Sequence, residues 1–399
     1  MQDEKIRYVS LYSGCGGLDL GFELAGYHQI ASFDHDATAL GTLEKNLGSR
    51  ILNKDLSEPD GEVIAVAAKA DVLIAGPPCQ GFSTAGKNDP KDFRNNHLVN
   101  VAEIASLARP KVVVIENVKG LLNPANSHHF EKTIGTLKRA GYSVDWAIHD
   151  IADYGVAQTR IRVLIVAVLS DKPLGLQLKC KQRLSLGEAL KGIGEQNNIG
   201  KLTLKKGCAD FLISEKIGPG QKLSNVRRGL TSVHTWDIPA VFGPVSQNEV
   251  SFLETIVKLR RQSRRRDTGD ADPVSYDLLR EYFGHSTDML TKSLLEKKYL
   301  RRVDGHLDIT NTFNGKYRRP RWDGLSPTVD TRFGQHRYFL HPDEHRGFSV
   351  REAARIQSFP DSFHFSESDS ANYRMIGNAV PPRFAETIAN CIRKQWATI

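Results

Sequence analysis

The stretch YVSLYSGCGGLD, residues 8–19, joins a strand to a glycine-rich turn that leads into a helix. Its first five residues are mostly β-branched, aromatic or leucine, which favours a buried strand. Gly14, Gly16 and Gly17 then allow the backbone to turn tightly and to approach a ligand closely. In a doubly wound sheet such a turn lies at the carboxyl edge of the strands, where small molecules bind. The stretch therefore predicts an α/β fold with a ligand site at this turn.

The alternation of strand and helix continues over the first half of the chain. Short apolar runs recur at 29–33, 72–75, 112–115 and 163–168. Segments with helical periodicity are 19–25, 37–47, 98–108 and 130–140, followed further along by 247–259, 276–298, 349–356 and 383–396. Strands that are apolar on both faces and separated by helices form parallel sheets covered on both sides. We therefore expect a doubly wound, mostly parallel α/β domain.

Bulk composition narrows the class of protein. The 399 residues are 40% hydrophobic and 25% charged, as in globular proteins, and the length predicts one large and one smaller domain. The sequence contains no apolar run long enough for a spanning helix and no secretion leader, so we expect a cytoplasmic protein. The five cysteines are scattered without CxxC spacing, which argues against disulfides and against a metal site.

Basic residues concentrate in the second half of the chain. The net charge is +8, which is compatible with a polyanionic partner. Two runs stand out, KLRRQSRRR at 258–266 and RRPR at 318–321, although such runs are often only solvated surface. At 294–309 (LLEKKYLRRVDGHLDI) a helical pattern runs into a hairpin-like Asp304-Gly305 turn, which is the outline of a winged-helix module.

A carboxylate follows the glycine turn at the end of the second strand. Asp34 is placed there to accept hydrogen bonds from the ribose hydroxyls of an adenosine. The turn lacks the GxGxxG spacing of dinucleotide sites, and no phosphate-binding Lys-Ser/Thr follows it. The pattern predicts a nucleoside ligand without a pyrophosphate, and S-adenosylmethionine fits that description. The alternative is a turn needed only for packing.

Three further segments place reactive side chains at strand ends. In AGPPCQGFS (75–83) two prolines stiffen the backbone before Cys79, which suits a thiolate nucleophile, although most intracellular cysteines only pack. In VIENV (114–118) Glu116 can protonate or hydrogen-bond a heterocycle nitrogen. In QTRIR (158–162) Arg160 and Arg162 share one face and can hold a carbonyl oxygen or a phosphate.

The ordered motifs YSGCGG, PPCQG, IENV, QTRIR and GNAVPP (377–382) make the chain resemble the cytosine-5 DNA methyltransferase family. The resemblance covers residues 8–170 and about 341–396. It implies a Rossmann-like, seven-stranded, S-adenosylmethionine-dependent core with a second, smaller target-recognition domain. On this reading residues 1–195 form the catalytic and cofactor-binding core, 196–340 recognise DNA, and 341–399 complete the core with a helix beside the first strand.

The resemblance also implies residue roles. Cys79 is expected to attack C6 of cytosine, Glu116 to bind N3 and the exocyclic amine, Arg162 to bind O2, and Arg160 to bind a phosphate or Glu116. The implied cofactor residues are Tyr12, Ser13, Gly14, Cys15, Gly16, Gly17, Asp34, His35, Asp55, Leu56, Pro78, Leu98, Asn378, Ala379 and Val380. The implied DNA contacts are Gln80, Ser83, Lys87, Gln158, Arg264, Arg265, Arg318 and Arg319. The family usually has Phe at position 12 and Glu at position 34.

The implied activity is transfer of a methyl group from S-adenosylmethionine to C5 of a cytosine that is flipped out of a specific duplex DNA sequence. We expect a monomeric, nucleoid-associated bacterial enzyme. It would be either an orphan enzyme or part of a restriction-modification system whose endonuclease acts on the same site without direct contact.

Three alternatives stay open. An RNA cytosine-5 methyltransferase would keep the same catalytic set, although the large basic middle segment favours duplex DNA. A catalytically silent DNA-binding protein would have no need of Cys79 and Glu116. A small-molecule methyltransferase would not need a Cys-Glu pair that activates a pyrimidine.

Overall fold

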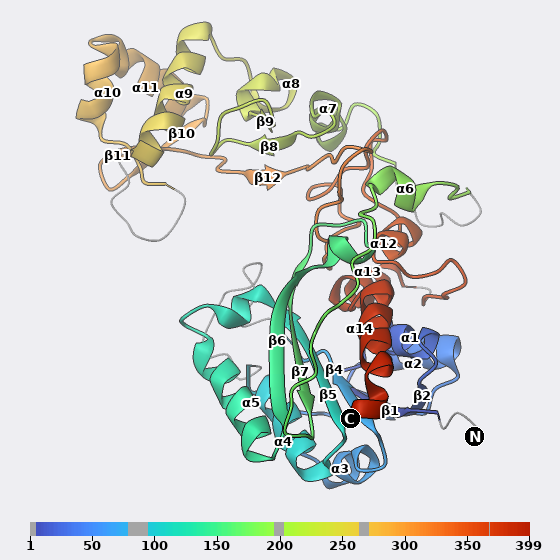
Figure 1. The fold of residues 1–399 in the computed structure, drawn as a ribbon. Helices are drawn as coiled ribbons and strands as arrows, with labels where there is room; N and C mark the ends of the chain where they lie inside the picture. The colour runs from blue at the N-terminus through green and yellow to red at the C-terminus, as the bar shows by residue number, and fades with distance from the viewer. Residues whose placement is uncertain (1–4, 79–94, 195–202, 263–270, 367) are drawn as a thin grey trace. The chain divides into compact units, whose positions relative to one another are not determined.

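The computed structural model describes residues 5–78, 95–194, 203–262, 271–366 and 368–399 (Figure 1). Two compact units divide the chain. Unit 1 comprises Met1–Gly200, Asp323–Arg332 and Val350–Ile399, and unit 2 comprises Lys201–Trp322 and Phe333–Ser349. The chain thus re-enters unit 1 twice, whereas the sequence predicts a single return at residue 341.

Unit 1 is built on a seven-stranded sheet with the order β3-β2-β1-β4-β5-β7-β6 (Figure 1). The strands are β1 (Arg7–Leu11), β2 (His28–Asp34), β3 (Ile51–Asn53), β4 (Val72–Ala75), β5 (Val112–Val118), β6 (Ser143–Asp150) and β7 (Ile161–Val168). From β3 to β5 neighbouring strands are parallel, whereas β7 runs antiparallel to β5 and to β6. The predicted mostly parallel, seven-stranded α/β fold is confirmed. The chain reverses direction across the sheet between β1 and β4, the switch point at which such sheets bind ligands.

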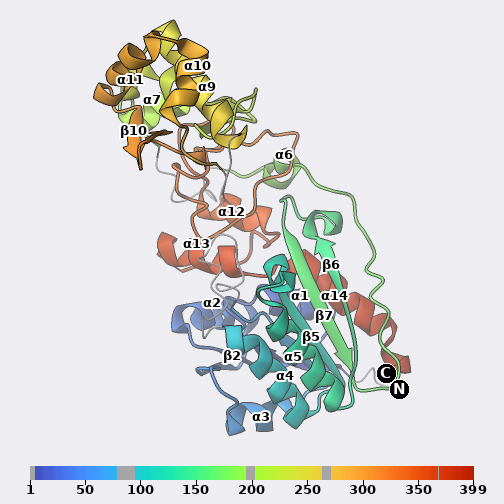
Figure 2. The same cartoon turned by 90° about the vertical axis from the view of Figure 1, so that its left-hand side faces the viewer.

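Helices cover both faces of this sheet because its strands are apolar on both faces. The helices of unit 1 are α1 (Gly17–Leu24), α2 (Ala37–Leu47), α3 (Gly61–Ala67), α4 (Asn96–Ala108), α5 (Ser127–Arg139), α6 (Leu186–Leu190), α12 (Val350–Ile356), α13 (Asp369–Asn378) and α14 (Pro382–Lys394). Val9 and Leu73 face a core shared with α3, α4 and α5, whereas Tyr8 and Ile74 face a core shared with α1 and α14. Figure 2 shows α4 and α5 on the opposite side of the sheet from α14. The sheet and the helices on its two faces thus form three layers.

The C-terminal helix packs closely against the first helix of the chain. A Cβ atom at Gly21 of α1 would lie 2.3 Å from the Cβ of Ala385 in α14, so glycine is required for this approach. The Tyr27 hydroxyl donates a hydrogen bond to the carbonyl oxygen of Ala389 at 3.0 Å. Residues more than 360 positions apart are thereby held together next to β1.

Some elements differ from those that the sequence predicts. The edge strand β6 was missed because it alternates polar and apolar residues, with Trp146 and Ile148 exposed by 42% and 46%. The short elements β3 and α3 were also missed. The helix expected over 276–298 is two helices, since Gly284 has φ 54° and ψ −134°, a conformation that ends the first of them.

The described residues of unit 2 form two separate apolar cores. Its helices are α7 (Ala209–Lys216), α8 (Pro239–Phe242), α9 (Gln247–Gln262), α10 (Tyr276–Phe283) and α11 (Ser286–Glu296). Its strands are β8 (Lys222–Ser224), β9 (Ser232–Val233) and β12 (Asn314–Lys316), which form one sheet, and the hairpin β10 (Leu300–Val303) and β11 (His306–Ile309). One core lies around α9, α10, α11 and the hairpin, the other around α7, β8 and β9. The predicted Asp304-Gly305 turn is confirmed, with φ values of 47° and 76°.

Within the described residues, no helix is long and apolar enough to cross a membrane.

Candidate active site

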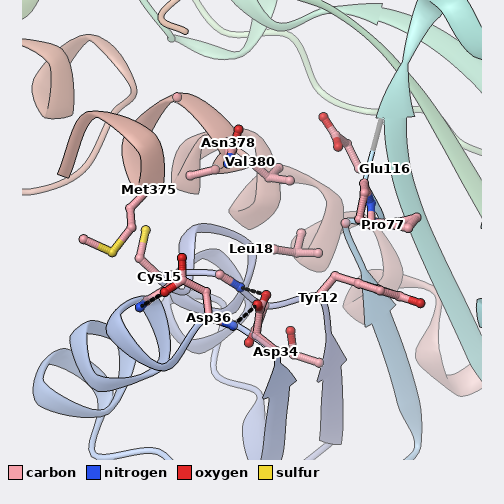
Figure 3. Close-up of a pocket in the computed structure, with 18 of the residues that line it drawn as sticks. Tyr12, Cys15, Leu18, Asp34, Asp36, Pro77, Glu116, Met375, Asn378 and Val380 are labelled. Atoms are coloured by element: carbon pink, nitrogen blue, oxygen red, sulfur yellow. Dashed lines mark hydrogen bonds between the residues drawn. The ribbon is translucent and has the colours of Figure 1, made fainter. Parts of the chain in front are cut away.

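A cavity of about 330 Å³ lies in unit 1 at the carboxyl ends of the central strands (Figure 3). The predicted cofactor residues that line it are Tyr12, Ser13, Gly14, Cys15, Asp34, His35, Pro78, Asn378, Ala379 and Val380. The predicted catalytic residues Glu116, Arg160 and Arg162 line it as well. Residues that were not among the predicted site residues complete the wall: Ser10, Leu18, Asp36, Ala39, Gly76, Pro77, Val118, Arg374, Met375 and Gly377. Side chains from distant parts of the chain therefore line one cavity.

The glycine turn forms one wall of the cavity and requires its glycines for different reasons. Gly14 and Gly16 have φ values of 54° and 88°, in the left-handed region that favours glycine. A Cβ atom at Gly14 would meet nothing within 4 Å, so the turn is open toward the cavity. A Cβ atom at Gly17 would lie 2.3 Å from the carbonyl oxygen of Val380. Gly16 and Gly17 do not line the cavity. Because they lack a side chain, Leu43 and Val380 can pack closely behind it.

Asp34 presents its carboxylate at the end of β2 and is 8% exposed. One oxygen accepts a hydrogen bond from the Gly14 amide at 2.8 Å, and the other accepts one from the Asp36 amide at 2.9 Å (Figure 3). These bonds fix the carboxylate relative to the glycine turn. The neighbouring Asp36 caps α2 and also holds Arg374 at 2.9 Å, so both acids are already oriented without a ligand.

The hydroxyl group of Tyr12 forms a hydrogen bond with the loop after β3. It donates to the carbonyl oxygen of Leu56 at 2.8 Å and lies 3.1 Å from the Nδ1 atom of His97. The predicted cofactor residues Asp55, Leu56 and Leu98 are described but do not line the cavity. Leu98 lies in α4 and is fully buried, and Leu56 is 2% exposed. A role for these three residues in ligand binding stays a prediction.

A carboxylate and a guanidinium face each other on adjacent strands. Val118 of β5 pairs with Arg162 of β7 in the antiparallel ladder, which brings Arg162 next to Glu116. The Nε atom of Arg162 lies 2.7 Å from Oε1 of Glu116, and both side chains are at most 12% exposed. At this exposure the two opposite charges compensate each other, because an unpaired charge would be costly to bury. The arrangement sets an acid with a fixed orientation at the cavity wall.

Arg160 has a different environment from Arg162. Its guanidinium donates to the carbonyl oxygens of Val329 at 3.0 Å, Gly377 at 3.2 Å and Ala379 at 3.2 Å. Arg162, and not Arg160, lies next to Glu116, and the other role predicted for Arg160, binding of a phosphate, stays a prediction. Arg160 instead holds the turn that carries the wall residues of the GNAVPP motif.

Two side chains that were predicted to contact DNA are buried and form hydrogen bonds within the protein. Gln158 is fully buried and donates to Oε1 of Gln357 at 2.6 Å, while its own oxygen accepts from the Val329 amide at 3.0 Å. Arg319 is 5% exposed and donates to several carbonyl oxygens of unit 2, including those of Ile217 at 2.6 Å and Ser214 at 2.9 Å. Both side chains are buried and hydrogen-bonded within the protein, and their role as DNA contacts stays a prediction. Arg318 is exposed.

The remaining predicted residues lie outside the described part of the chain. They are Cys79, Gln80, Ser83, Lys87, Arg264 and Arg265. Among the described cysteines, Cys15 lines the cavity, but burial raises the pKa of its thiol to about 12. Cys15 is therefore protonated at neutral pH and is not an activated nucleophile.

A buried acid lies beneath the glycine turn. Asp19 is fully buried in α1, and its carboxylate accepts hydrogen bonds from Ser10 at 3.0 Å, Ser32 at 2.6 Å and Gln29 at 3.0 Å. Burial raises its pKa to about 6, although these hydrogen bonds act in the opposite direction. Asp19 thus links the first helix to β1 and β2 and supports the turn from below.

Comparisons with known proteins agree with this geometry. The family profile of C-5 cytosine-specific DNA methylases matches residues 6–394. The Type II methyltransferase M.HgiBI of Herpetosiphon aurantiacus is 30% identical over 95% of this chain and 94% of its own length. The Type II methyltransferase M.DdeI of Desulfomicrobium norvegicum is 30% identical over 97% of this chain and 88% of its own length.

A solved structure shows the same fold at low sequence identity. The S. pombe Dnmt2 methyltransferase superposes with a TM-score of 0.53 at 16% identity, and the match covers 98% of this chain and 99% of that one. Since the family profile extends over nearly the whole chain, with the Glu116–Arg162 pair and the glycine turn on one cavity, the chain belongs to the C-5 cytosine-specific DNA methylase family.

Proposed function

We propose that this DNA cytosine-5 methyltransferase transfers the methyl group of S-adenosylmethionine to C5 of a cytosine flipped out of a specific duplex DNA sequence. The observation that carries the proposal is the cavity itself. It joins the Asp34 carboxylate, placed to hold a nucleoside, to the Glu116–Arg162 pair, placed to hold a pyrimidine. The methyl donor and the target cytosine can therefore bind in the same cavity of unit 1.

The cavity suits the proposed methyl donor. Its volume of about 330 Å³ falls within the range of small-molecule sites. Asp34 is oriented to accept the ribose hydroxyls, Tyr12 supplies an aromatic wall, and the open face of Gly14 leaves room beside the backbone. Acidic side chains on this wall also favour a ligand that carries a sulfonium cation. When bound, S-adenosylmethionine supplies an electrophilic methyl group.

The pyrimidine half of the site activates a carbon that is otherwise a poor nucleophile. The thiolate of Cys79, which lies outside the described residues, adds to C6 and forms a C–S bond, so that electron density moves to C5. Glu116 stabilises this addition by hydrogen bonding to N3 and the exocyclic amine, and Arg162 holds Glu116 in position and contacts O2. C5 takes the methyl group, its proton leaves to a base, the C–S bond breaks and the thiolate returns.

The cytosine must leave the duplex for this chemistry. C6 is not accessible inside a stacked helix, and flipping a base costs a few kcal/mol. Residues 80–87, which follow the proposed nucleophile, are our candidate for the loop that closes over the flipped base, and they lie outside the described residues.

Unit 2 is our candidate for the target-recognition domain. It carries much of the basic charge of the chain, and Arg318 is exposed on it. Arginine and lysine contacts to phosphates position a protein on DNA, whereas contacts to base edges specify the sequence. The names of the relatives, Type II methyltransferases, support a role in a restriction-modification system. We propose a monomer whose cognate endonuclease acts on the same site without direct contact.

Methyl transfer to two nucleic acids tests the proposal. The full chain is incubated with radiolabelled S-adenosylmethionine and either duplex genomic DNA or tRNA, and labelled DNA is sequenced after bisulfite treatment. The proposal predicts label in duplex DNA at cytosines within one recurring sequence. Label in tRNA alone would identify an RNA methyltransferase, and no label in either substrate, with bound S-adenosylhomocysteine demonstrated by calorimetry, would contradict catalysis on nucleic acid.

A further inference from the structure

The second half of unit 2 has the element order of a winged helix. The order along the chain is α9, a bridging residue Val274, α10, α11, then the hairpin β10–β11. Val274 pairs with Leu307 of β11 through two mutual backbone hydrogen bonds of 2.8 Å, so it forms the third, minimal strand of the wing. Only Gly284 and His285 separate α10 from α11, which is the short glycine-containing turn of a helix-turn-helix. Figure 1 shows these elements grouped together.

This module, the described residues 247–262 and 271–309, has its own core and two sets of polar contacts. Leu290 and Leu294 of α11 pack with Phe252 of α9 and with Leu307 of the wing. Such a core holds the helices as one body.

The polar contacts connect α9 to α11 and to the wing. Glu249 of α9 is 3% exposed and accepts from Ser293 at 2.6 Å and from Lys297 at 2.8 Å, which fixes α11. Arg260 of α9 lies 2.7 Å from Asp308 of the wing, and Arg301 donates to the same carboxylate at 2.8 Å. The second helix of the pair and the wing are therefore both rigidly positioned.

One face of α11 is exposed and chemically mixed. Thr287, Leu290, Thr291 and Leu294 form its buried face. The exposed stripe runs along the opposite side and consists of Asp288, Met289, Lys292 and Glu296. Met289 is 66% exposed, which is unusual for an apolar side chain in the middle of a polar stripe. A cationic donor beside an apolar group matches what base edges offer in the major groove, namely guanine acceptors and the thymine methyl.

The segment from α11 into the wing is positively charged. Residues 286–303 contain five basic and two acidic side chains, a net charge of +3. Lys298, Arg301 and Arg302 are exposed where the helix passes into the hairpin. A basic wing next to an exposed helix is suited to the phosphates that flank a groove. An acidic or apolar protein surface would match the mixed stripe less well.

We propose that α11 is the recognition helix of this enzyme: it enters the major groove of the target duplex, where Met289 and Lys292 read base edges while Arg302 on the wing contacts phosphate. The inference rests on the proposed function, because it names the part of unit 2 that reads the DNA sequence. It assigns specificity to one helix rather than to the arginine runs as a whole. Both reading residues lie in the first two turns of α11, the part of a recognition helix that contacts bases.

The test compares sequence preference, not activity alone. The full chain and its variants methylate a pool of duplex oligonucleotides that carry the sequence found for the wild type with each base pair randomised in turn, and methylated products are counted by bisulfite sequencing. We expect Met289→Ala and Lys292→Gln each to lose about tenfold discrimination or more at one or two adjacent positions. Arg302→Gln should lower methylation of all duplexes alike and reduce the salt dependence of binding by about one phosphate contact.

A matched control variant and the possible outcomes distinguish failure of the proposed function from failure of the recognition role of α11. Lys258→Gln removes an exposed lysine from α9 of the same module and should leave base preference unchanged. Thermal unfolding confirms that each variant is folded, which is expected because all four side chains are exposed. If the wild type makes no 5-methylcytosine, the proposed function fails. If the wild type is active but Met289→Ala and Lys292→Gln keep its preference at every position, with or without a uniform loss of rate, the recognition role of α11 is overturned.

Discussion

Replacing Asp34 by asparagine tests the nucleoside half of the site. The carboxylate accepts one backbone hydrogen bond on each oxygen, from Gly14 at 2.8 Å and from Asp36 at 2.9 Å. Asparagine has a single acceptor oxygen, so one of these two amides would face an NH₂ group and lose its partner. The negative charge that holds the ribose hydroxyls would be lost in the same step. Asp34→Asn should therefore weaken both the glycine turn and the binding of S-adenosylhomocysteine.

The two effects differ in size and in the measurement that detects them. A buried amide without an acceptor costs about 1–3 kcal/mol, which thermal unfolding of the free protein will detect as a lower Tm. Hydrogen bonds to a charged group contribute about 1.5–3 kcal/mol, and each 1.4 kcal/mol is a factor of ten in affinity. Isothermal titration calorimetry should thus find a Kd for S-adenosylhomocysteine that is about 10- to 150-fold higher than in the wild type.

Asp60→Asn is the matched control. Asp60 also accepts from two backbone amides, those of Glu62 at 2.8 Å and Val63 at 3.1 Å, but it caps α3 and does not line the cavity. Asparagine is nearly as good a capping residue as aspartate. This variant should therefore keep the wild-type Kd. An unchanged Kd in Asp34→Asn, measured beside an unchanged Asp60→Asn, would refute the assignment of Asp34 to the ligand.

Three further substitutions probe other parts of the site. Glu116→Gln should lower the single-turnover methylation rate about 10²- to 10³-fold while the Kd for S-adenosylhomocysteine changes little; equal rates would contradict the role of the acid. Gly17→Ala places a Cβ 2.3 Å from the Val380 carbonyl oxygen and should lower stability by about 1–3 kcal/mol, whereas Gly41→Ala, with nothing within 4 Å in α2, should not destabilise. Asp19 has a pKa raised by burial from 3.8 to about 6, so the stability of its protonated form is present below pH 3.8 and is lost as the pH rises through 6. Between pH 4 and pH 7.5, urea unfolding should show a loss of about 2.4 kcal/mol in the wild type that Asp19→Asn lacks, and parallel pH profiles of the two proteins would contradict the raised pKa of Asp19.

The sequence predicts the sheet well where burial is uniform. Runs such as 72–75 and 112–115 are apolar on both faces, since helices cover both sides, and each proved to be a strand. The edge strand β6 could not be recognised in this way, because one of its faces is partly exposed and its residues alternate. The short strand β3 has only three residues and offers no periodicity to detect.

The sequence predicted where the side chains of the candidate site lie on the sheet, but not which groups they form hydrogen bonds with. Strand ends place Asp34 and Glu116 at one edge of the sheet, and both line the cavity. The sequence does not reveal which backbone carbonyl groups converge on a side chain, and this decides the environment of Arg160 and Arg319. Both belong to basic patterns that suggest a ligand, yet both donate to buried carbonyl oxygens. A buried arginine of this kind becomes recognisable only when the chain segments it joins are placed in space.

Covalent capture of the target base tests the central claim most directly. The full chain, the variant Cys79→Ser and the variant Cys15→Ser are incubated with S-adenosylmethionine and a duplex that contains the methylated sequence with 5-fluorocytosine at the target position. Fluorine at C5 cannot leave as a proton does, so the C–S bond should persist and the adduct should survive denaturing electrophoresis. We predict an adduct with the wild type and with Cys15→Ser and none with Cys79→Ser. Loss of the adduct in Cys15→Ser with retention in Cys79→Ser, or no adduct from a wild-type protein that methylates the unmodified duplex, would contradict the account.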